Sequence, residues 1–251
     1  MKVFIFFLLA ALMTVGAPPV TAGKAESTVG FQEDFSGPAG SEELPEGWKP
    51  LYFKKIPRHT RYKVVREGND SYLQAESHAS ASGIYREVAL DPKRYRYLSW
   101  RWKVHGILSK GDARSREGDD YPARIYVTFQ YDPEKASVGK AFKYGLIRLW
   151  YGKYPPSATI TYIWANRLPK GESIPNAYTG KTVMMMAVES GDGKAGQWVE
   201  EHRDVYADFR RLFKEEPPAI SGIGIMTDTD NTGEKMTAGY DDFMLSAVPS
   251  R

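Results

Sequence analysis

The sequence predicts an all-β protein, an antiparallel β-sandwich with one or two decorating helices, and three observations carry this prediction. Apolar and polar residues alternate along several short segments, as they do in half-buried strands. Clusters of turn-forming residues separate these segments, which is typical of sandwiches. No repeat and no low-complexity linker divides the chain. We therefore expect one β-sandwich domain over residues 23–251, preceded by a signal peptide at residues 1–22.

The expected signal peptide has three recognisable parts. Lys2 supplies a positive charge, and residues 3–15 are almost wholly apolar. Val20 and Ala22 are small residues at the two positions that a signal peptidase reads, with cleavage expected after Ala22. The apolar stretch is short for a helix that spans a bilayer, although an N-terminal membrane anchor is the alternative. We expect a periplasmic or secreted protein with no transmembrane segment in the mature chain.

Composition and charge exclude several classes of protein. The chain has 251 residues, 42% hydrophobic and 26% charged, so it is neither disordered nor collagen-like. It has no cysteine, which excludes disulfides, thiol catalysis, cysteine-ligated zinc and c-type haem. A net charge of +3 with interspersed signs does not indicate nucleic-acid binding. Four histidines without an HExxH spacing argue against a zinc site.

Six segments are expected to form the main strands. Residues 95–105 alternate strictly, with tryptophans on the apolar face. Residues 124–131 alternate in the same way, with Arg124 and Tyr126 on the polar face. Residues 182–189 are apolar on both faces, which predicts a central, covered strand. The remaining strands are expected at residues 158–164, 220–227 and 236–248.

Two helices are expected to decorate the sandwich. Residues 136–150 carry apolar side chains near helical spacing. Residues 204–214 show the same pattern, with Asp204 as the N-cap. The prolines at positions 217 and 218 would stop this second helix.

Several motifs together resemble one protein family. They are Arg-His-Thr-Arg-Tyr at 58–62, Arg-Glu-Gly-Asp-Asp at 116–120, Pro-Ala-Arg-Ile-Tyr-Val at 122–127, Tyr-Ile-Trp-Ala-Asn-Arg-Leu-Pro at 162–169, and Met-Thr-Asp-Thr-Asp-Asn-Thr-Gly at 226–233. The chain resembles a family of exported bacterial proteins that is catalogued only as a domain of unknown function. The resemblance implies an exported, single-domain protein. It supplies no activity and no catalytic residues.

A looser likeness links the two chain ends to the jelly-roll sandwiches of carbohydrate-binding modules. Residues 31–35 look like the opening strand of those modules, and residues 239–245 look like the closing one. The likeness implies a jelly-roll-like sandwich in which these two strands lie side by side. It also implies a structural calcium ion, the one cofactor we consider, with Glu33, Asp241 and Asp242 as its ligands.

The loop before the strand at 124–131 is rich in both signs of charge. Glu117, Asp119 and Asp120 stand close together, and carboxylates remain ionised at short range only beside a cation. Neighbouring arginines, including Arg124, can supply that charge. The loop is therefore either a solvated turn with surface ion pairs or a ligand-binding loop.

A second acidic loop contains Asp228, Asp230 and Asn231. Its alternating oxygen-bearing residues resemble the start of a calcium loop, but Gly239 occupies the twelfth position, where an EF-hand requires glutamate. A polar turn between two strands explains the segment better. The loop can still contact a ligand.

Two further groups of residues are typical of polar-ligand sites. Arg58 and Arg61 can clamp a carboxylate or phosphate, or can belong to a solvated basic turn. Trp164 precedes Asn166 and Arg167, and an aromatic ring beside amide and charged groups suits a sugar. An ordinary core tryptophan is the alternative.

These patterns favour a protein that binds a glycan or another polar small molecule in a charged cleft. The chain has no GxSxG, P-loop or dinucleotide motif. A carbohydrate-active hydrolase or lyase with paired carboxylates is the first alternative, and a structural envelope protein is the second. The candidate ligand-binding residues are Arg58, Arg61, Glu117, Asp119, Asp120, Arg124, Tyr126, Trp164, Asn166, Arg167, Asp228, Asp230 and Asn231. We expect nine of them to gather around one polar cleft, namely Arg61, Glu117, Asp119, Asp120, Arg124, Asn166, Arg167, Asp228 and Asp230.

Overall fold

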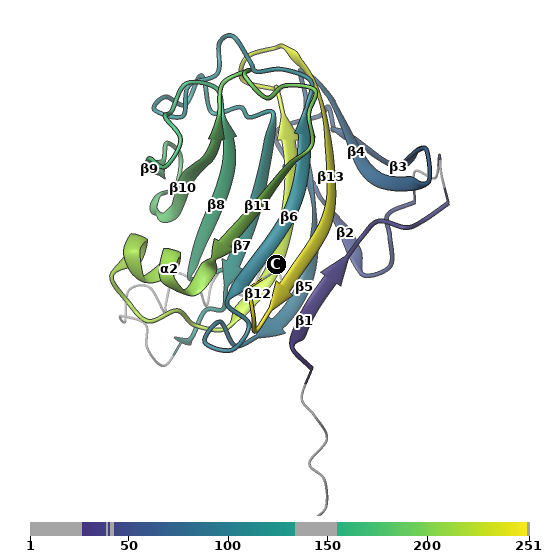
Figure 1. Cartoon of the computed structure of the whole chain (residues 1–251). Coiled ribbons are helices and arrows are strands. Elements are labelled where there is room, and N and C mark those ends of the chain that lie inside the picture. Colours follow the sequence, from purple (N-terminus) through teal and green to yellow (C-terminus); the bar gives the residue numbers. More distant parts are fainter. Residues whose placement is uncertain (1–26, 39, 41–42, 134–154, 250–251) are drawn as a thin grey trace, which may run out of the picture.

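The computed structural model describes residues 27–38, 40, 43–133 and 155–249 of the chain. In this part of the chain two β-sheets pack face to face, and one helix lies at one end (Figure 1). The jelly-roll-like β-sandwich predicted from the sequence is confirmed. The expected signal peptide and the expected helix at 136–150 lie outside the described residues.

The first sheet, sheet A, has the strand order β11-β6-β13-β4-β3. β13 is its longest strand; it pairs with β6 along one side, and with β4 and β1 along the other. The opening and closing strands therefore lie side by side, as the sequence predicted. The strands of sheet A are β1 (Val29–Glu33), β3 (Arg61–Glu67), β4 (Asp70–His78), β6 (Tyr97–Val104), β11 (Val199–Asp204) and β13 (Lys235–Ser246).

The second sheet, sheet B, has the strand order β2-β5-β12-β7-β8-β10-β9. All its pairs are antiparallel except β8 with β10. That pair is parallel because the chain leaves β8, crosses over and forms β9 before it returns in β10. The strands of sheet B are β2 (Trp48–Leu51), β5 (Ala81–Leu90), β7 (Ala123–Phe129), β8 (Ala158–Ala165), β9 (Ser173–Asn176), β10 (Gly180–Ser190) and β12 (Ile220–Asp228).

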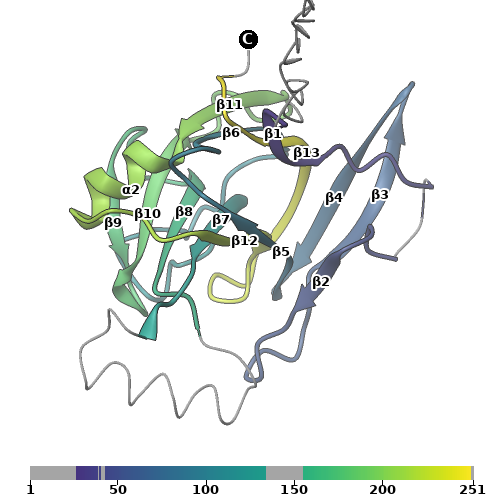
Figure 2. The same ribbon diagram turned by 90° about the horizontal axis from the view of Figure 1, so that it is seen from below.

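Figure 2 shows the two sheets from below. The core between them is rich in aromatic side chains. Trp100 and Trp102 from β6 are fully buried and contact Tyr162 and Trp164 from β8. A second apolar cluster lies on the other face of β8 and β10, beneath the connection from β6 to β7. β10 is therefore covered on both faces and paired on both sides, which confirms the strand predicted at 182–189.

The helix α2 (Val205–Phe213) confirms the second helix predicted from the sequence. Asp204 is its N-cap, and the Asp204 carboxylate accepts the backbone N–H of Ala207 at 2.9 Å. Phe209 turns inward and contacts Phe129 of β7, with 4.5 Å between ring centroids. Within the described residues, no helix is both long and apolar enough to cross a bilayer.

Candidate functional site

One end of the sandwich gathers most of the charged residues that the sequence analysis identified. At this end β4 and β12 finish and β5 and β13 begin, because His78 pairs with Lys235 and Asp228 pairs with Ala81. α2 lies at the opposite end of the sandwich (Figure 1). Loops from both sheets meet here, so residues far apart in sequence become neighbours.

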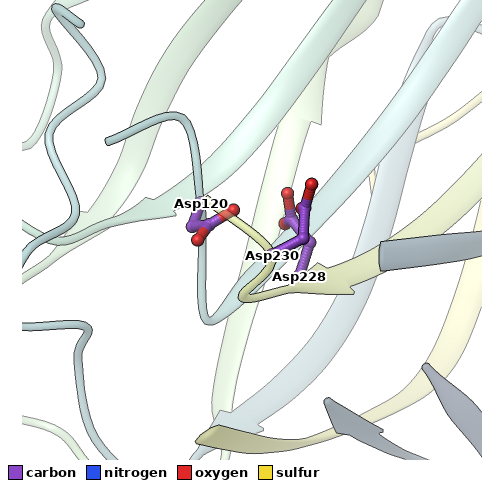
Figure 3. Close-up of side chains that lie close together, drawn as sticks. All are labelled: Asp120, Asp228 and Asp230. Atoms are coloured by element: carbon purple, nitrogen blue, oxygen red, sulfur yellow. The ribbon is translucent and has the colours of Figure 1, made fainter. Parts of the chain in front are cut away.

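Three aspartates form an acidic cluster at this end (Figure 3). Asp120 comes from the loop before β7, Asp228 ends β12, and Asp230 lies in the loop that follows. One carboxylate oxygen from each lies within 4.8 Å of the others. Asp120 and Asp228 are buried, and Asp230 is half-buried. Carboxylate oxygens suit hard cations, so the acidic cluster could hold Ca²⁺ or Mg²⁺.

Asp120 and Asp228 each hold the other's loop. The Asp120 carboxylate accepts the backbone N–H of Thr232 at 2.7 Å and that of Asn231 at 3.4 Å. The Asp228 carboxylate accepts the backbone N–H of Tyr121 at 3.3 Å. Such N–H groups stabilise the charged carboxylates and fix both loops. A cation in the acidic cluster would share these oxygens with the N–H donors.

Arg124 neutralises part of the acidic cluster. Its guanidinium pairs with the Asp228 carboxylate, and both side chains are almost completely buried. Burial raises the pKa of Asp228 well above its ordinary value; Arg124 opposes the rise and the neighbouring aspartates add to it. One arginine thus faces several carboxyl groups, which leaves a negative site in a dry environment.

Asp119 and two tyrosines complete the surroundings of Arg124. The Asp119 carboxylate accepts the hydroxyl of Tyr121 at 2.9 Å and the side-chain amide of Asn176 at 3.1 Å. The rings of Tyr121 and Tyr126 lie 5.0 and 5.6 Å from the Arg124 guanidinium carbon. These contacts hold the cation in place.

Trp164, Asn166 and Arg167 support the loops at this end of the molecule. Trp164 is fully buried and packs on Trp102, so its ring does not face solvent. Asn166 donates to the Asp120 carbonyl at 2.8 Å and accepts a backbone N–H at 2.8 Å. Arg167 donates to the carbonyl of Ser109. Trp164 and Asn166 are buried and leave little surface for a ligand, whereas Arg167 is exposed.

Glu117 and Asn231 lie at the surface around the acidic cluster. Both are exposed. The Asn231 side-chain oxygen accepts the hydroxyl of Tyr178 at 3.3 Å, and that hydroxyl also lies 3.0 Å from the carbonyl of Arg116. Tyr178 therefore joins the turn before β10 to both acidic loops.

The residues expected to bind calcium take arginine partners. Glu33 accepts the indole N–H of Trp48 at 2.8 Å and pairs with Arg86 at 3.0 Å. Asp241 and Asp242 both pair with Arg101. Burial raises the pKa of Asp241 to about 6, and Arg101 opposes that rise. The calcium ion expected between the chain ends stays a prediction.

A basic groove lies on the outer side of sheet A at the same end. Its volume is about 790 Å³. Strand register puts Arg61 beside Glu76, Glu76 beside Thr237, and His78 beside Lys235. His105 follows β6, and its backbone N–H donates to the Thr237 carbonyl at 3.1 Å. The groove is lined by Arg58, His59, Arg61, Glu76, Ser77, His78, Ser80, His105, Gly106, Ile107, Lys235, Met236 and Thr237.

An exposed aromatic ring stands beside the basic groove. A second hollow of about 450 Å³ shares His59 and Arg61 with it, so the two hollows adjoin at these residues. Tyr52 lines this second hollow, and 58% of its surface is exposed. Its ring stacks on His59 with 4.2 Å between centroids and 22° between planes.

The residues expected around one cleft therefore lie at two separate sites. Asp119, Asp120, Arg124, Asp228 and Asp230 come together in and around the acidic cluster. Arg58 and Arg61 line the basic groove instead. The sequence analysis did not identify the groove residues His78, His105 and Lys235, because strand pairing brings them together from separate segments. It also did not identify Tyr52, which lines the adjoining hollow.

The solved structures that are similar to this chain include carbohydrate-binding modules. The family 11 carbohydrate-binding module of the cellulosomal cellulase Lic26A-Cel5E of Clostridium thermocellum is 10% identical, with a TM-score of 0.43, over 88% of this chain and 96% of that one. The K3 cleaved adhesin domain of Lys-gingipain from Porphyromonas gingivalis is 8% identical, with a TM-score of 0.37, over 86% of this chain and 96% of that one.

A third similar structure is the CBM22-1-CBM22-2 tandem domain of Xyn10C from Paenibacillus barcinonensis. It is 13% identical, with a TM-score of 0.35, over 92% of this chain and 52% of that one. No curated protein sequence matches this chain. A family model does: the family described as a protein of unknown function (DUF3047) matches residues 46–244, and the chain belongs to that family.

Proposed function

We propose that this protein is exported and binds a glycan, or a polar ligand of similar chemistry, in the basic groove. One observation carries the proposal: the exposed ring of Tyr52, stacked on His59, borders an open groove lined by polar side chains. Pyranose rings have apolar faces and polar edges. An exposed aromatic ring beside hydrogen-bonding groups can meet both at once.

The basic groove also has the rigidity that a binding site needs. Its floor contains Ser77 and Ser80, whose hydroxyl oxygens are 3.0 Å apart. The Thr60 hydroxyl donates to the Thr227 carbonyl at 2.7 Å, which joins the start of β3 to β12. These hydroxyl groups are buried, so the groove is held from beneath by both sheets.

Binding has more support than catalysis by paired carboxylates. Asp228 is held by Arg124, and Asp120 accepts two backbone N–H groups. Glu189 pairs with Lys170 at 3.0 Å and with Lys194 at 2.7 Å. A general acid or a nucleophile must reach its substrate, whereas these carboxylates are buried and already engaged.

A glycan array followed by calorimetric titration of the best ligand tests the proposal. Tyr52→Ala removes the stacking ring, and affinity should fall about tenfold. Tyr178→Ala is the matched control, because Tyr178 is a comparably exposed tyrosine that does not line the groove. Equal affinity for the wild type and Tyr52→Ala, or no binding to any glycan, would contradict the proposal.

Export is tested separately. Intact-mass measurement of the protein recovered from the periplasm or the medium should show loss of residues 1–22. A full-length mass, together with recovery in the membrane fraction, would instead support an N-terminal anchor.

A further inference from the structure

The basic groove carries an excess of positive charge. Arg58, Arg61 and Lys235 line it together with a single carboxylate, Glu76. That carboxylate already pairs with Lys63 at 2.8 Å. The glutamate therefore does little to balance Arg58 and Lys235.

Two of these cations have no ion-pair partner. Arg58 and Lys235 are exposed, and neither makes an ion pair within the part of the chain that the structure describes. Elsewhere on the same face of sheet A the cations are matched. Arg101 pairs with three aspartates, and Lys103 pairs with Glu67 at 2.8 Å. The groove thus differs in charge from the rest of its own sheet.

Histidines also line the basic groove. Three of the four histidines in the sequence line the groove, namely His59, His78 and His105. Neutral imidazole both donates and accepts hydrogen bonds, and protonated imidazole adds positive charge. They are spread along the groove and form no metal-ligand cluster, because within the described residues the acidic cluster alone has that geometry. The groove is thus equipped for a long anionic ligand more than for a metal ion.

The turn that presents His78 is built under strain. Ala79 has a φ of 45°, a left-handed conformation that costs an alanine free energy. The Ala79 N–H donates to the Glu234 carbonyl at 2.9 Å, and the N–H of His78 donates to the Ser80 hydroxyl at 3.0 Å. These contacts tie the end of β4 to the start of β13, and so place His78 beside Lys235.

We propose that the ligand of the basic groove is an acidic glycan, a chain of sugars that carry carboxylate or sulfate groups. This inference rests on the proposed function. The anionic groups would meet Arg58 and Arg61 on one wall and Lys235 on the other, while a sugar ring would stack on Tyr52. A guanidinium offers paired donors to a carboxylate or a sulfate, which favours an anionic sugar over a neutral one.

Calorimetric titration of the full chain with three oligosaccharides of equal length tests this inference. They are an oligogalacturonate, a sulfated oligosaccharide and a neutral cello-oligosaccharide. At least one acidic ligand should bind about tenfold or more tightly than the neutral one. Its affinity should fall as NaCl rises from about 0.05 to 0.5 M, because salt screens exposed charges. The two acidic ligands show whether carboxylate or sulfate is preferred.

Variants that each remove one positive charge show where the acidic ligand binds. Arg58→Ala and Lys235→Ala should each lower the affinity for the acidic ligand about tenfold. Lys181→Ala removes an exposed lysine outside the groove and should leave this affinity unchanged. Unchanged melting temperatures show that the variants fold.

The outcomes separate the two proposals. Tighter binding of the neutral ligand, with dependence on Tyr52 but not on Arg58 or Lys235, would overturn the acidic-glycan inference and leave the proposed function standing. Failure of all three oligosaccharides and of a broader glycan array would overturn both.

Discussion

The hydroxyl oxygens of Ser77 and Thr229 lie 2.8 Å apart, and this contact joins the floor of the basic groove to the loop of the acidic cluster. Both side chains are buried. Thr229 stands between Asp228 and Asp230 in the chain, so the same short segment carries two acidic side chains and one support of the groove. The two sites are thus built on one framework.

Thr229→Val should destabilise the fold by about 1–2 kcal/mol, because the valine would leave buried polar groups without their partner. Thr232→Val is the matched control. The Thr232 hydroxyl is buried and has no hydrogen-bond partner among the residues that the structure describes, so its loss should cost little. Urea denaturation measures the free energy of unfolding of both variants. Equal destabilisation by the two variants would contradict this account of the hydroxyl contact.

Arg124→Met should destabilise the protein by roughly 3–5 kcal/mol, because it leaves the Asp228 carboxylate buried without its cation. The double variant with Asp228→Asn should recover a large part of that loss. Denaturation of the two single variants and the double variant gives the coupling free energy. Additive effects would show that the pair is not coupled.

Asp230→Asn should raise the free energy of unfolding at pH 7. Burial and the nearby Asp120 raise the pKa of Asp230. The folded state therefore holds this proton more tightly than the unfolded state, and stability falls as the pH rises through the raised pKa. The amide removes that loss. Asp192→Asn, at an exposed position, is the control for the thermal melts.

Glu201 gives a second pH-dependent prediction. Burial raises its pKa to about 7, and Lys170 and Lys194 oppose the rise. Wild-type stability should therefore decline between about pH 4.5 and 7 through this group, by roughly 1–3 kcal/mol. Glu201→Gln should remove the decline. Glu200→Gln, its exposed neighbour on β11, should retain it. If the stability of both variants changed with pH in the same way, the decline would not come from Glu201.

Local patterns were enough to predict the strands that form the centre of the sandwich. β6 alternates along its whole length, and its tryptophans are buried as expected. Asp204 caps α2 as its residue type predicted. In both elements the signal lies within a few consecutive residues, where a period of two or a capping side chain is visible without knowledge of the fold.

The binding surfaces depend on long-range pairing and could be predicted only in part. Arg58 and Arg61 stood out because they are close in sequence. His78 and Lys235 meet only because β4 pairs with β13 in one register. Trp164 satisfied the local pattern of a sugar site, but the alternation of β8 directs its side chain into the core.

The histidine side chains give the most direct test of the central claim. In two-dimensional NMR spectra of the histidine rings, titration with the glycan should shift the signals of His59, His78 and His105 with one common saturation curve. His202 lies on β11 outside the groove and should not move. A shift of His202 alone, or four unchanged histidine signals at a saturating glycan concentration, would contradict binding in the basic groove.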